Sequence, residues 1–357
     1  MSENNYHDNL NKENTFKLRE LMKQLPKFAA LFFRGIEPTT ASRTRIAYAY
    51  DLGIFFEYIK DNNPLYKDTE IPDIPLEVLD QITALDIEEY LEYLSYYVKD
   101  DMEHQNSECG KMRKLASLRT FYNYYYRKEL IQTNPASIVS MPKIHQKEIV
   151  RLDIDEVAEL LDEVELGDKL TKKEQNFHQK TRKRDLALLT LLLGTGIRVS
   201  ECVGLDIDDI DLKNTGIKIR RKGGKEQIVY FSDEVAEALV DYMEERKAII
   251  AETGHENALF LSLQKKRINV RSVENLVKKY SKLVTQLKNI TPHKLRSTYG
   301  TNLYRETGDI YLVASVLGHS DINTTKKHYA AIDEERRRMA RNQVTLREKN
   351  PDNKRPE

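Results

Sequence analysis

A segment near the middle of the chain, Asn134 to Lys147, contains Pro135 and Pro142 and few large apolar residues. Proline restricts its own backbone and that of the preceding residue, so this composition predicts an extended linker. The linker divides the 357 residues into two parts of ordinary domain size, roughly 100–200 residues each. We expect a disordered tail over 1–15, domains over 16–134 and 151–332 joined by a linker over 135–150, and a C-terminal helix with a disordered tail over 333–357.

The pattern of apolar residues predicts a helical first domain. Thr40 is a suitable N-cap for a helix that ends at Asn62-Asn63-Pro64. Further helices are expected at 84–98 and 107–128.

The second domain is expected to combine helices with a small antiparallel sheet. An acidic helix over 153–165 is followed by a polar stretch and then by a buried helix, DLALLTLLLG, which glycines end. Ile217 and Ile219 then alternate with polar residues, Gly223-Gly224 suits a two-residue hairpin loop, and 228–231 returns as the partner strand. Helices are predicted at 233–251, 270–287, 293–306, 309–317 and from 322 onward. The predicted fold class is mainly α, with an all-helical domain followed by an α+β domain.

Composition excludes several classes of protein. Hydrophobic residues make up 40% and charged residues 32%, which is enough apolar material for packed cores. No apolar run approaches the ~18 residues of a membrane span, and the polar N-terminal sequence does not resemble a secretory signal. Two cysteines, Cys109 and Cys202, suit a reducing cytoplasm, which is the expected location.

Charge is balanced over the whole chain but unevenly distributed along it. Lys plus Arg equals Asp plus Glu at 57 each. Eight acidic and no basic residues lie over 152–168, whereas six basic residues oppose one acidic residue over 213–227, and eight oppose one over 263–288. Basic clusters in a neutral chain fit a surface that binds a polyanion. The alternative is that they are ordinary solvated faces.

Two motifs place cations at the ends of helices. In GTGIRVSEC, Arg198 follows a buried helix and therefore needs a partner, which Glu201 at i+3 can supply. In TPHKLR, Thr291 and Pro292 open a helix with His293 in its first turn and Arg296 on the same face, an arrangement suited to phosphate. The alternatives are a structural Arg–Glu pair and an ordinary capped helix with an exposed histidine.

Three single residues complete the set of candidates. His319 follows a helix end at Gly318, Lys222 lies at the predicted hairpin tip, and Tyr329 lies in NTTKKHYAA. Each has a simpler reading, as a loop histidine, a solvated lysine or one of 20 tyrosines. The chain contains no Walker loop, dinucleotide GxGxxG, HExxH, paired CxxC or GxSxG, so we expect no cofactor and no metal.

Taken in this order, the motifs resemble the tyrosine site-specific recombinase (integrase) family, whose pattern is Arg, a hairpin Lys, His-x-x-Arg, His or Trp, and a Tyr nucleophile. GTGIRVSEC resembles the family's first box, HKLRSTYGTNL and VLGHSDINTTKKHY its second, and LASLRTFYNYYYRKELIQTNPA the end of its arm domain, so the resemblance covers about residues 20–340. It assigns six catalytic residues, Arg198, Lys222, His293, Arg296, His319 and Tyr329. The spacing of ten positions between the last two departs from Xer-type members, which have one fewer, and matches some integrases of mobile elements.

The resemblance implies a SAM-like helical arm, a catalytic domain, and DNA strand transfer without metal or ATP. The two arginines would donate to the phosphate oxygens, and Tyr329 would attack phosphorus to give a 3′-phosphotyrosyl intermediate. The remaining implied roles are leaving-group acid for Lys222, acid–base partner for His293, further hydrogen-bond donor for His319, and orientation of Arg198 or His293 for Glu201.

The implied partners are double-stranded DNA with specific recombination sites and a homotetramer that holds two sites through a Holliday junction; no membrane partner is expected. The amphipathic stretch after Asp333 would dock onto a neighbouring copy, unless it packs within its own chain. An Xer-like role in chromosome dimer resolution adds a cell-division DNA translocase as a partner, and the alternative role is integration and excision of a mobile element. A type IB topoisomerase and a non-catalytic DNA-binding protein are the competing functions.

Candidate DNA contacts are the basic residues Arg43, Arg45, Lys111, Arg113, Lys114, Arg119, Arg220, Arg221, Lys225, Lys265, Lys266, Arg267 and Arg271.

Overall fold

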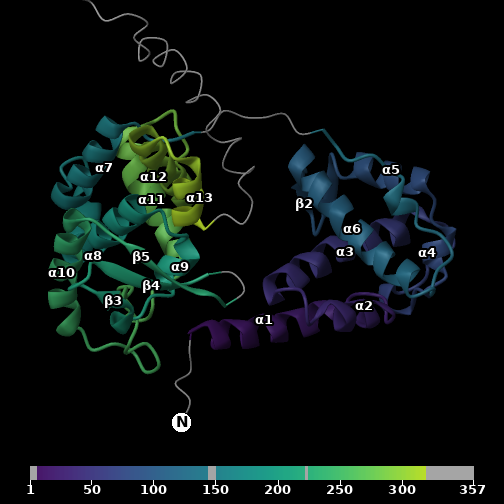
Figure 1. The fold of residues 1–357 in the computed structure, drawn as a ribbon. Coiled ribbons are helices and arrows are strands. Elements are labelled where there is room, and N and C mark those ends of the chain that lie inside the picture. Colours follow the sequence, from purple (N-terminus) through teal and green to yellow (C-terminus); the bar gives the residue numbers. More distant parts are fainter. Residues whose placement is uncertain (1–5, 144–149, 222–223, 319–357) are drawn as a thin grey trace, which may run out of the picture. The chain divides into compact units, whose positions relative to one another are not determined.

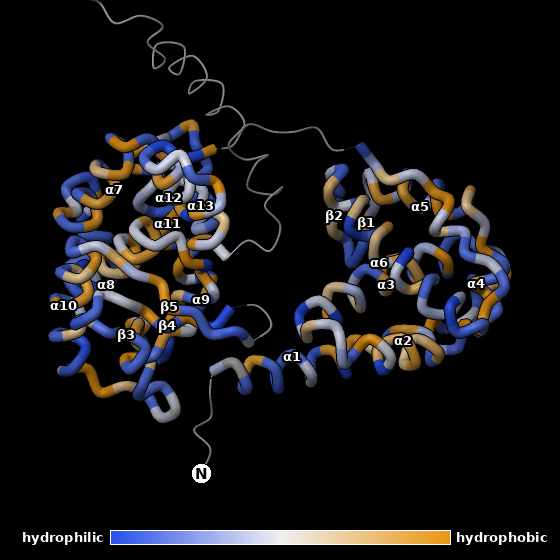
Figure 2. Tube along the Cα trace, in the orientation of Figure 1, coloured by the Kyte–Doolittle hydropathy of each residue, from blue (hydrophilic) through white to orange (hydrophobic). Residues whose placement is uncertain are grey.

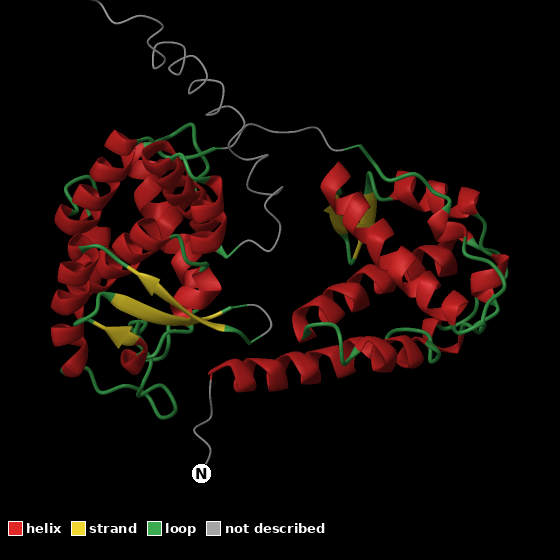
Figure 3. Cartoon of the chain, viewed as in Figure 1, coloured by secondary structure: helices red, strands yellow, loops and turns green. Residues whose placement is uncertain are grey.

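The computed structural model describes residues 6–143, 150–221 and 224–318. The chain divides into two compact units, Met1–Lys147 and Glu148–Glu357 (Figure 1). The described elements are mostly helices, with one small antiparallel sheet in each unit (Figure 3). The fold class predicted from the sequence is confirmed.

The first unit is built around two long helices. Its elements are α1 (Tyr6–Met22), α2 (Ala29–Ile36), α3 (Ser42–Asn62), the 3₁₀ turn η1 (Ile71–Asp73), α4 (Val78–Gln81), α5 (Ala84–Tyr93), β1 (Tyr97–Lys99), β2 (Met102–His104), α6 (Glu108–Arg127) and the 3₁₀ turn η2 (Pro135–Ser137). Both α1 and α6 pack on α3. The core between the helices is aromatic: the ring of Phe121 makes edge-to-face contacts with Phe32, Phe56 and Tyr125.

Three features of this unit differ from the sequence prediction. Residues from Tyr6 onward form α1 instead of a disordered tail, because Leu18 on that helix is buried in the core. The helix expected over 84–98 ends at Tyr93 and is followed by a hairpin, in which the Tyr97 and His104 rings stack at 5.1 Å between centroids. The expected linker begins later than 135, because η2 and Val139 pack into the core of the unit.

The second unit surrounds one long helix. Its elements are α7 (Ile154–Leu166), α8 (Lys172–Thr195), α9 (Val199–Val203), the 3₁₀ turn η3 (Ile207–Asp209), β3 (Ile210–Asp211), β4 (Gly216–Arg220), β5 (Glu226–Tyr230), α10 (Asp233–Lys247), α11 (Val270–Val284), α12 (Pro292–Thr307) and α13 (Ile310–Leu317). Helices α7, α10 and α12 all pack on α8. Residues 187–192 of α8 are buried all round, as their continuous apolar sequence predicted.

Helix α8 begins earlier than the sequence suggested. The polar stretch before Lys183 belongs to the same helix, because Thr171 and Glu174 form a capping box at its N-terminus. The N-terminal half of α8 is therefore polar, and its C-terminal half lies in the core of the second unit.

The sheet has three strands in the order β3-β4-β5, all antiparallel, and β3 was not predicted. At the end of the β4–β5 hairpin the Arg221 N–H donates to the Lys225 carbonyl at 2.8 Å. Three residues therefore separate these paired positions, and the predicted two-residue loop is wrong. Figure 2 shows that the described end of this hairpin is hydrophilic.

Candidate active site

The C-terminal end of α8 places the first arginine. Gly196 follows the helix with a φ of +62°, and a Cβ atom at this position would overlap the Tyr299 ring. Glycine alone adopts this left-handed conformation without strain. The sharp turn brings Arg198 to the start of the short helix α9 and leaves the Gly196 carbonyl facing α12, where it accepts from Arg296.

Arg198 and Glu201 form the pair that their spacing predicted. The Arg198 guanidinium donates through Nη1 to Glu201 Oε1 at 2.7 Å, and the Arg198 backbone N–H donates to Oε2 at 2.8 Å. The Glu201 side chain is 4% exposed, whereas that of Arg198 is 39% exposed. A buried carboxylate thus holds Nη1 of a guanidinium whose side chain stays partly accessible.

Helix α12 supplies the second arginine. The helix begins at Pro292 with Thr291 as its N-cap, as predicted, and His293 is exposed in its first turn. Arg296 lies one turn further along and is buried, at 5% exposure. Its guanidinium donates to the carbonyl oxygens of Gly196 and Leu317.

A third arginine, Arg221, lies in the same cluster, although its position in the basic run 213–227 predicts a DNA contact. Its side chain is 8% exposed and donates to the carbonyls of Leu317 and Val316 at 2.7 and 2.8 Å. Burial lowers the pKa of this guanidinium, and the Glu201 carboxylate, 3.8 Å away, partly offsets that effect. The Arg221 guanidinium therefore binds within the fold, and a DNA contact by this residue stays a prediction.

The alternation of β4 contained a signal for this placement. Ile217 and Ile219 are buried, Lys218 and Arg220 are exposed, and Arg221 continues the buried parity. Side chains of a strand alternate between its two faces, so Arg221 points inward although it belongs to a basic run.

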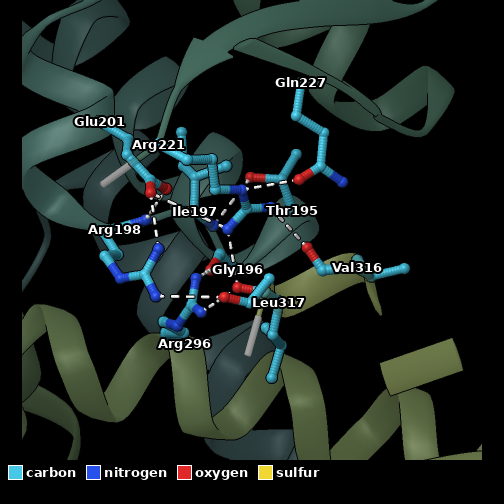
Figure 4. A network of polar contacts seen from close by, with 11 residues as sticks. Thr195, Gly196, Ile197, Arg198, Glu201, Arg221, Gln227, Arg296, Val316 and Leu317 are labelled. Atoms are coloured by element: carbon cyan, nitrogen blue, oxygen red, sulfur yellow. Dashed lines mark hydrogen bonds and ion pairs between the residues drawn. The ribbon is translucent and has the colours of Figure 1, made fainter. Parts of the chain in front are cut away.

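All three arginines meet at the C-terminal end of α13 (Figure 4). Arg221 and Arg296 donate to the carbonyls of residues 316 and 317, and Arg198 makes a longer contact, 3.5 Å, with that of Gly318. The last carbonyls of a helix lack intrahelical partners and carry partial negative charge, so they stabilise clustered cations. Two of the guanidiniums, those of Arg198 and Arg221, face the Glu201 carboxylate, and the third donates to backbone carbonyls. Among the described residues, this gathering of cations is suited to an anion.

Three of the six predicted catalytic residues, Lys222, His319 and Tyr329, lie outside the described residues. Two of them are neighbours of the cluster in the chain: Lys222 follows Arg221, and His319 follows Gly318. The structure thus brings Arg198, Glu201 and Arg296 together and carries His293 on the same helix as Arg296.

Seven of the candidate DNA contacts are exposed: Arg43, Arg113, Arg220, Lys225, Lys265, Lys266 and Arg271. Arg45 and Lys111 are largely covered and pair with Glu37 and Glu108.

The charged groups of three further candidates bind within the fold, and their contacts with DNA stay predictions. The Arg267 guanidinium donates to Asp206 and to the carbonyls of residues 203 and 205. That of Arg119 donates to the carbonyls of residues 136 and 139. Lys114 is buried, which lowers its pKa, and its ammonium donates to Asn106 at 2.8 Å.

Three further findings concern metal ligands, membrane spans and cysteines. Over the described ranges, no three His, Cys, Asp or Glu side chains gather where they could hold a metal ion. None of the helices in those ranges combines the length and the apolar character needed to cross a membrane. Both cysteines are free thiols, with Cys109 exposed and Cys202 buried.

Comparison with known proteins shows the family to which the chain belongs. The model of the phage integrase family matches residues 150–336, just over half of the chain. The chain belongs to the phage integrase family. The XerC tyrosine recombinase of Caldanaerobacter subterraneus subsp. tengcongensis is 34% identical over 84% of this chain and 81% of its own. The chain is therefore a tyrosine recombinase, as its motifs predicted.

Solved structures of tyrosine recombinases share the fold. The XerH site-specific recombinase bound to a palindromic difH substrate aligns with a TM-score of 0.65 at 20% identity, over 92% of this chain and 88% of that chain. The Tn1549 transposon integrase in complex with circular intermediate DNA aligns with a TM-score of 0.61 at 21% identity, over 88% and 99%. The likeness extends over both units of the fold.

Proposed function

We propose that this tyrosine recombinase cleaves and rejoins DNA at specific sites through a 3′-phosphotyrosyl intermediate on Tyr329, and exchanges strands through a Holliday junction. The observation that carries the proposal is the meeting of Arg198, Arg221 and Arg296 at the end of α13. They come from three distant parts of the sequence, and their positive charge is suited to a phosphate.

The arginines offset charge at the scissile phosphate. Phosphorus that is attacked by an oxygen nucleophile passes through a pentacoordinate state with negative charge on its non-bridging oxygens. The partly accessible Arg198 side chain donates to one such oxygen. Arg296 donates to a second non-bridging oxygen, and for this at least one of its N–H groups leaves a backbone carbonyl. One preorganised donor of this kind contributes on the order of 10²–10³ in rate.

The remaining catalytic residues supply the covalent and proton-transfer steps. The Tyr329 oxygen forms a bond to phosphorus while the bond to the 5′-oxygen breaks, and Lys222 gives that oxygen its proton. His293 exchanges a proton with the tyrosine or phosphate, and His319 donates a further hydrogen bond. The phosphotyrosyl bond conserves the energy of the phosphodiester, so religation needs no ATP. The arginines offset the phosphate charge that a metal ion offsets in other enzymes.

The arm unit and the exposed basic residues hold the duplex. Phosphate contacts from exposed arginines and lysines fix position on DNA and make affinity fall steeply with salt. The related structures hold DNA recombination sites, which supports duplex DNA as the partner. The family resemblance further implies that four copies of the chain assemble on two sites, with the segment after Asp333 docking onto a neighbour.

The biological role is Xer-like, namely the resolution of chromosome dimers with a cell-division DNA translocase as partner. The support is the relation to curated recombinases named XerC and XerD, which extends over most of the chain. The second candidate is integration and excision of a mobile element, favoured by the ten positions between His319 and Tyr329. A plasmid with two directly repeated chromosomal sites distinguishes them: an Xer-like enzyme resolves it, and an element integrase acts on the element's ends instead.

Adduct trapping tests the proposed chemistry. A binding site is first selected from a random-sequence duplex library and then built into a suicide substrate with a nick next to the scissile phosphate. Wild-type protein is expected to form a covalent adduct on the 3′ side, and Tyr329→Phe is expected to bind without forming one. An absent adduct in wild type would favour a non-catalytic DNA-binding protein.

A relaxation assay tests the topoisomerase alternative. Supercoiled plasmid without the selected site should stay supercoiled in the presence of the wild-type protein. Efficient relaxation of that plasmid by a monomer would contradict the recombinase proposal.

A further inference from the structure

Arg221 joins four parts of the second unit through one side chain and its own backbone. Its Nε donates to the Gln227 side chain on β5 at 2.8 Å, and its Nη atoms donate to the last carbonyls of α13 at 2.7 and 2.8 Å. Glu201 on α9 lies 3.8 Å from Nη1. Figure 4 shows this guanidinium between the hairpin and the end of α13.

The backbone of Arg221 also closes the hairpin loop. Its N–H donates to the Lys225 carbonyl at 2.8 Å, and its carbonyl accepts from the Gly224 N–H at 3.1 Å. The residue thus fixes both sides of the loop base by main-chain bonds, while its side chain fixes that base against α13 and α9.

The end of α13 is shaped around this guanidinium. Gly318 has a φ of +62°, and a Cβ atom there would lie 2.6 Å from Arg221 Cζ. The absence of a side chain at Gly318 lets the planar group lie directly against the turn that leads to the next residue, His319.

Arg221 is less suited than Arg198 to bind a phosphate itself. Its Nε, Nη1 and Nη2 atoms all have protein acceptors, and the side chain is 8% exposed against 39% for Arg198. Lysine cannot replace this contact set, because one ammonium group does not reach acceptors in three directions with the geometry of a guanidinium.

We propose that Arg221 is a positioning residue for strand cleavage, which fixes the base of the β4–β5 hairpin against the last turn of α13 and against Glu201. The inference rests on the proposed function, since the residue that follows Arg221 is the leaving-group acid Lys222. A hairpin that is not fixed to α13 delivers the proton to the 5′-oxygen less well, and the arginines that bind phosphate still act.

The test compares two leaving groups. In the ordinary suicide duplex the 5′-oxygen needs a proton, whereas in a duplex with sulfur at that bridging position the thiolate leaves without one. Arg221→Lys is expected to slow single-turnover adduct formation about 10²-fold on the ordinary duplex at saturating DNA. On the sulfur duplex the variant is expected to recover most of the wild-type rate.

A matched control separates positioning from folding. Arg246 is another buried arginine of this unit, and its guanidinium donates to the carbonyls of residues 249, 256 and 258. Arg246→Lys is expected to lower the unfolding temperature and to keep the wild-type rate ratio between the two duplexes.

A second, milder variant keeps the proposal testable if Arg221→Lys does not fold. Gln227→Ala removes one acceptor of Arg221 and is expected to slow cleavage several-fold on the ordinary duplex with the same recovery on sulfur. Equal losses on both duplexes, or wild-type rates in both variants, would overturn the role of Arg221. A wild-type protein that forms no Tyr329 adduct would instead refute the proposed function.

Discussion

In the described part of each unit, charged side chains gather around a buried carboxylate, Asp51 in the first and Glu201 in the second, and the two clusters are built differently. In the first unit, Asp51 on α3 accepts from Arg113 and Ser117 on α6 at 2.6 and 2.7 Å, with the Lys114 ammonium 4.0 Å away. In the second unit, Arg198 and Arg221 face Glu201, and Arg221 and Arg296 donate to carbonyls at the end of α13. Both clusters use the same groups, guanidinium and carboxylate.

The two clusters differ in the elements that supply their side chains and in whether a cation stays accessible to a ligand. The Asp51 cluster connects two helices that already pack together, and its carboxylate is 1% exposed. The second cluster draws on α9, the end of β4, α12 and α13, and it keeps Arg198 accessible. The first arrangement cross-links a core, whereas the second holds cations ready for a ligand.

The largest effect is expected from removing the carboxylate of the first cluster. Asp51→Ala leaves a buried ammonium without its counter-charge, which typically destabilises a fold by about 3–5 kcal/mol. Urea unfolding of the purified variant measures the loss. A loss below 1 kcal/mol would show that the cluster is not a cross-link.

A substitution in the second cluster is expected to lower the rate of adduct formation. Arg296→Lys keeps the charge but loses the planar fork, so adduct formation at saturating DNA is expected to fall on the order of 10²–10³-fold. Single-turnover kinetics on the suicide duplex measures this loss. If DNA affinity fell and the rate of the bound complex did not, Arg296 would be a binding residue only.

A smaller effect is expected from the hydroxyl in the first cluster. Ser117→Ala removes one hydrogen bond to a buried carboxylate and should lower the unfolding free energy by about 1–3 kcal/mol. The rate of adduct formation by the folded protein should not change. A change in that rate without a loss of stability would remove the distinction between the clusters.

The smallest effect is a dependence of stability on pH. Burial raises the pKa of Asp51 above its ordinary 3.8, although Ser117 and Arg113 act in the opposite direction. Between pH 3.8 and the pKa of the folded state, Asp51 therefore keeps a proton that the unfolded chain has lost. The stabilisation from this protonation is fully present below pH 3.8 and is lost as the pH rises through the pKa of the folded state.

Asp51→Asn provides the reference for that measurement, because it lacks the titrating group. The stability of wild type relative to this variant is expected to fall as the pH rises above 3.8, as measured by urea unfolding at several pH values. A relative stability that grows with pH would mean that the cations outweigh burial at Asp51.

Local features of the site could be predicted from sequence. The i+3 spacing of Arg198 and Glu201 indicated their pairing, and Thr291-Pro292 indicated the start of α12. Both depend on neighbours within one helical turn. The alternation of buried and exposed residues along β4 also indicated that Arg221 points inward, but its basic neighbours suggested a surface role.

Long-range features could not be predicted in this way. Arg221 and Arg296 donate to backbone carbonyls of α13. Every residue has a backbone carbonyl, so the residue type does not indicate which carbonyl will accept. The first turns of α1 read as disordered because their sequence is polar, and packing on α3 stabilises the helix instead. The hairpin at 97–104 likewise depends on ring stacking between its strands.

The central claim is that Arg198 offsets charge on the scissile phosphate, and a neutral phosphate tests it most directly. A methylphosphonate replaces one non-bridging oxygen of the scissile phosphate by a methyl group and removes its negative charge. Arg198→Ala is expected to lose about 10²–10³-fold in adduct formation on the phosphate duplex and to recover most of it on the methylphosphonate duplex. An equal loss on both duplexes would contradict the account.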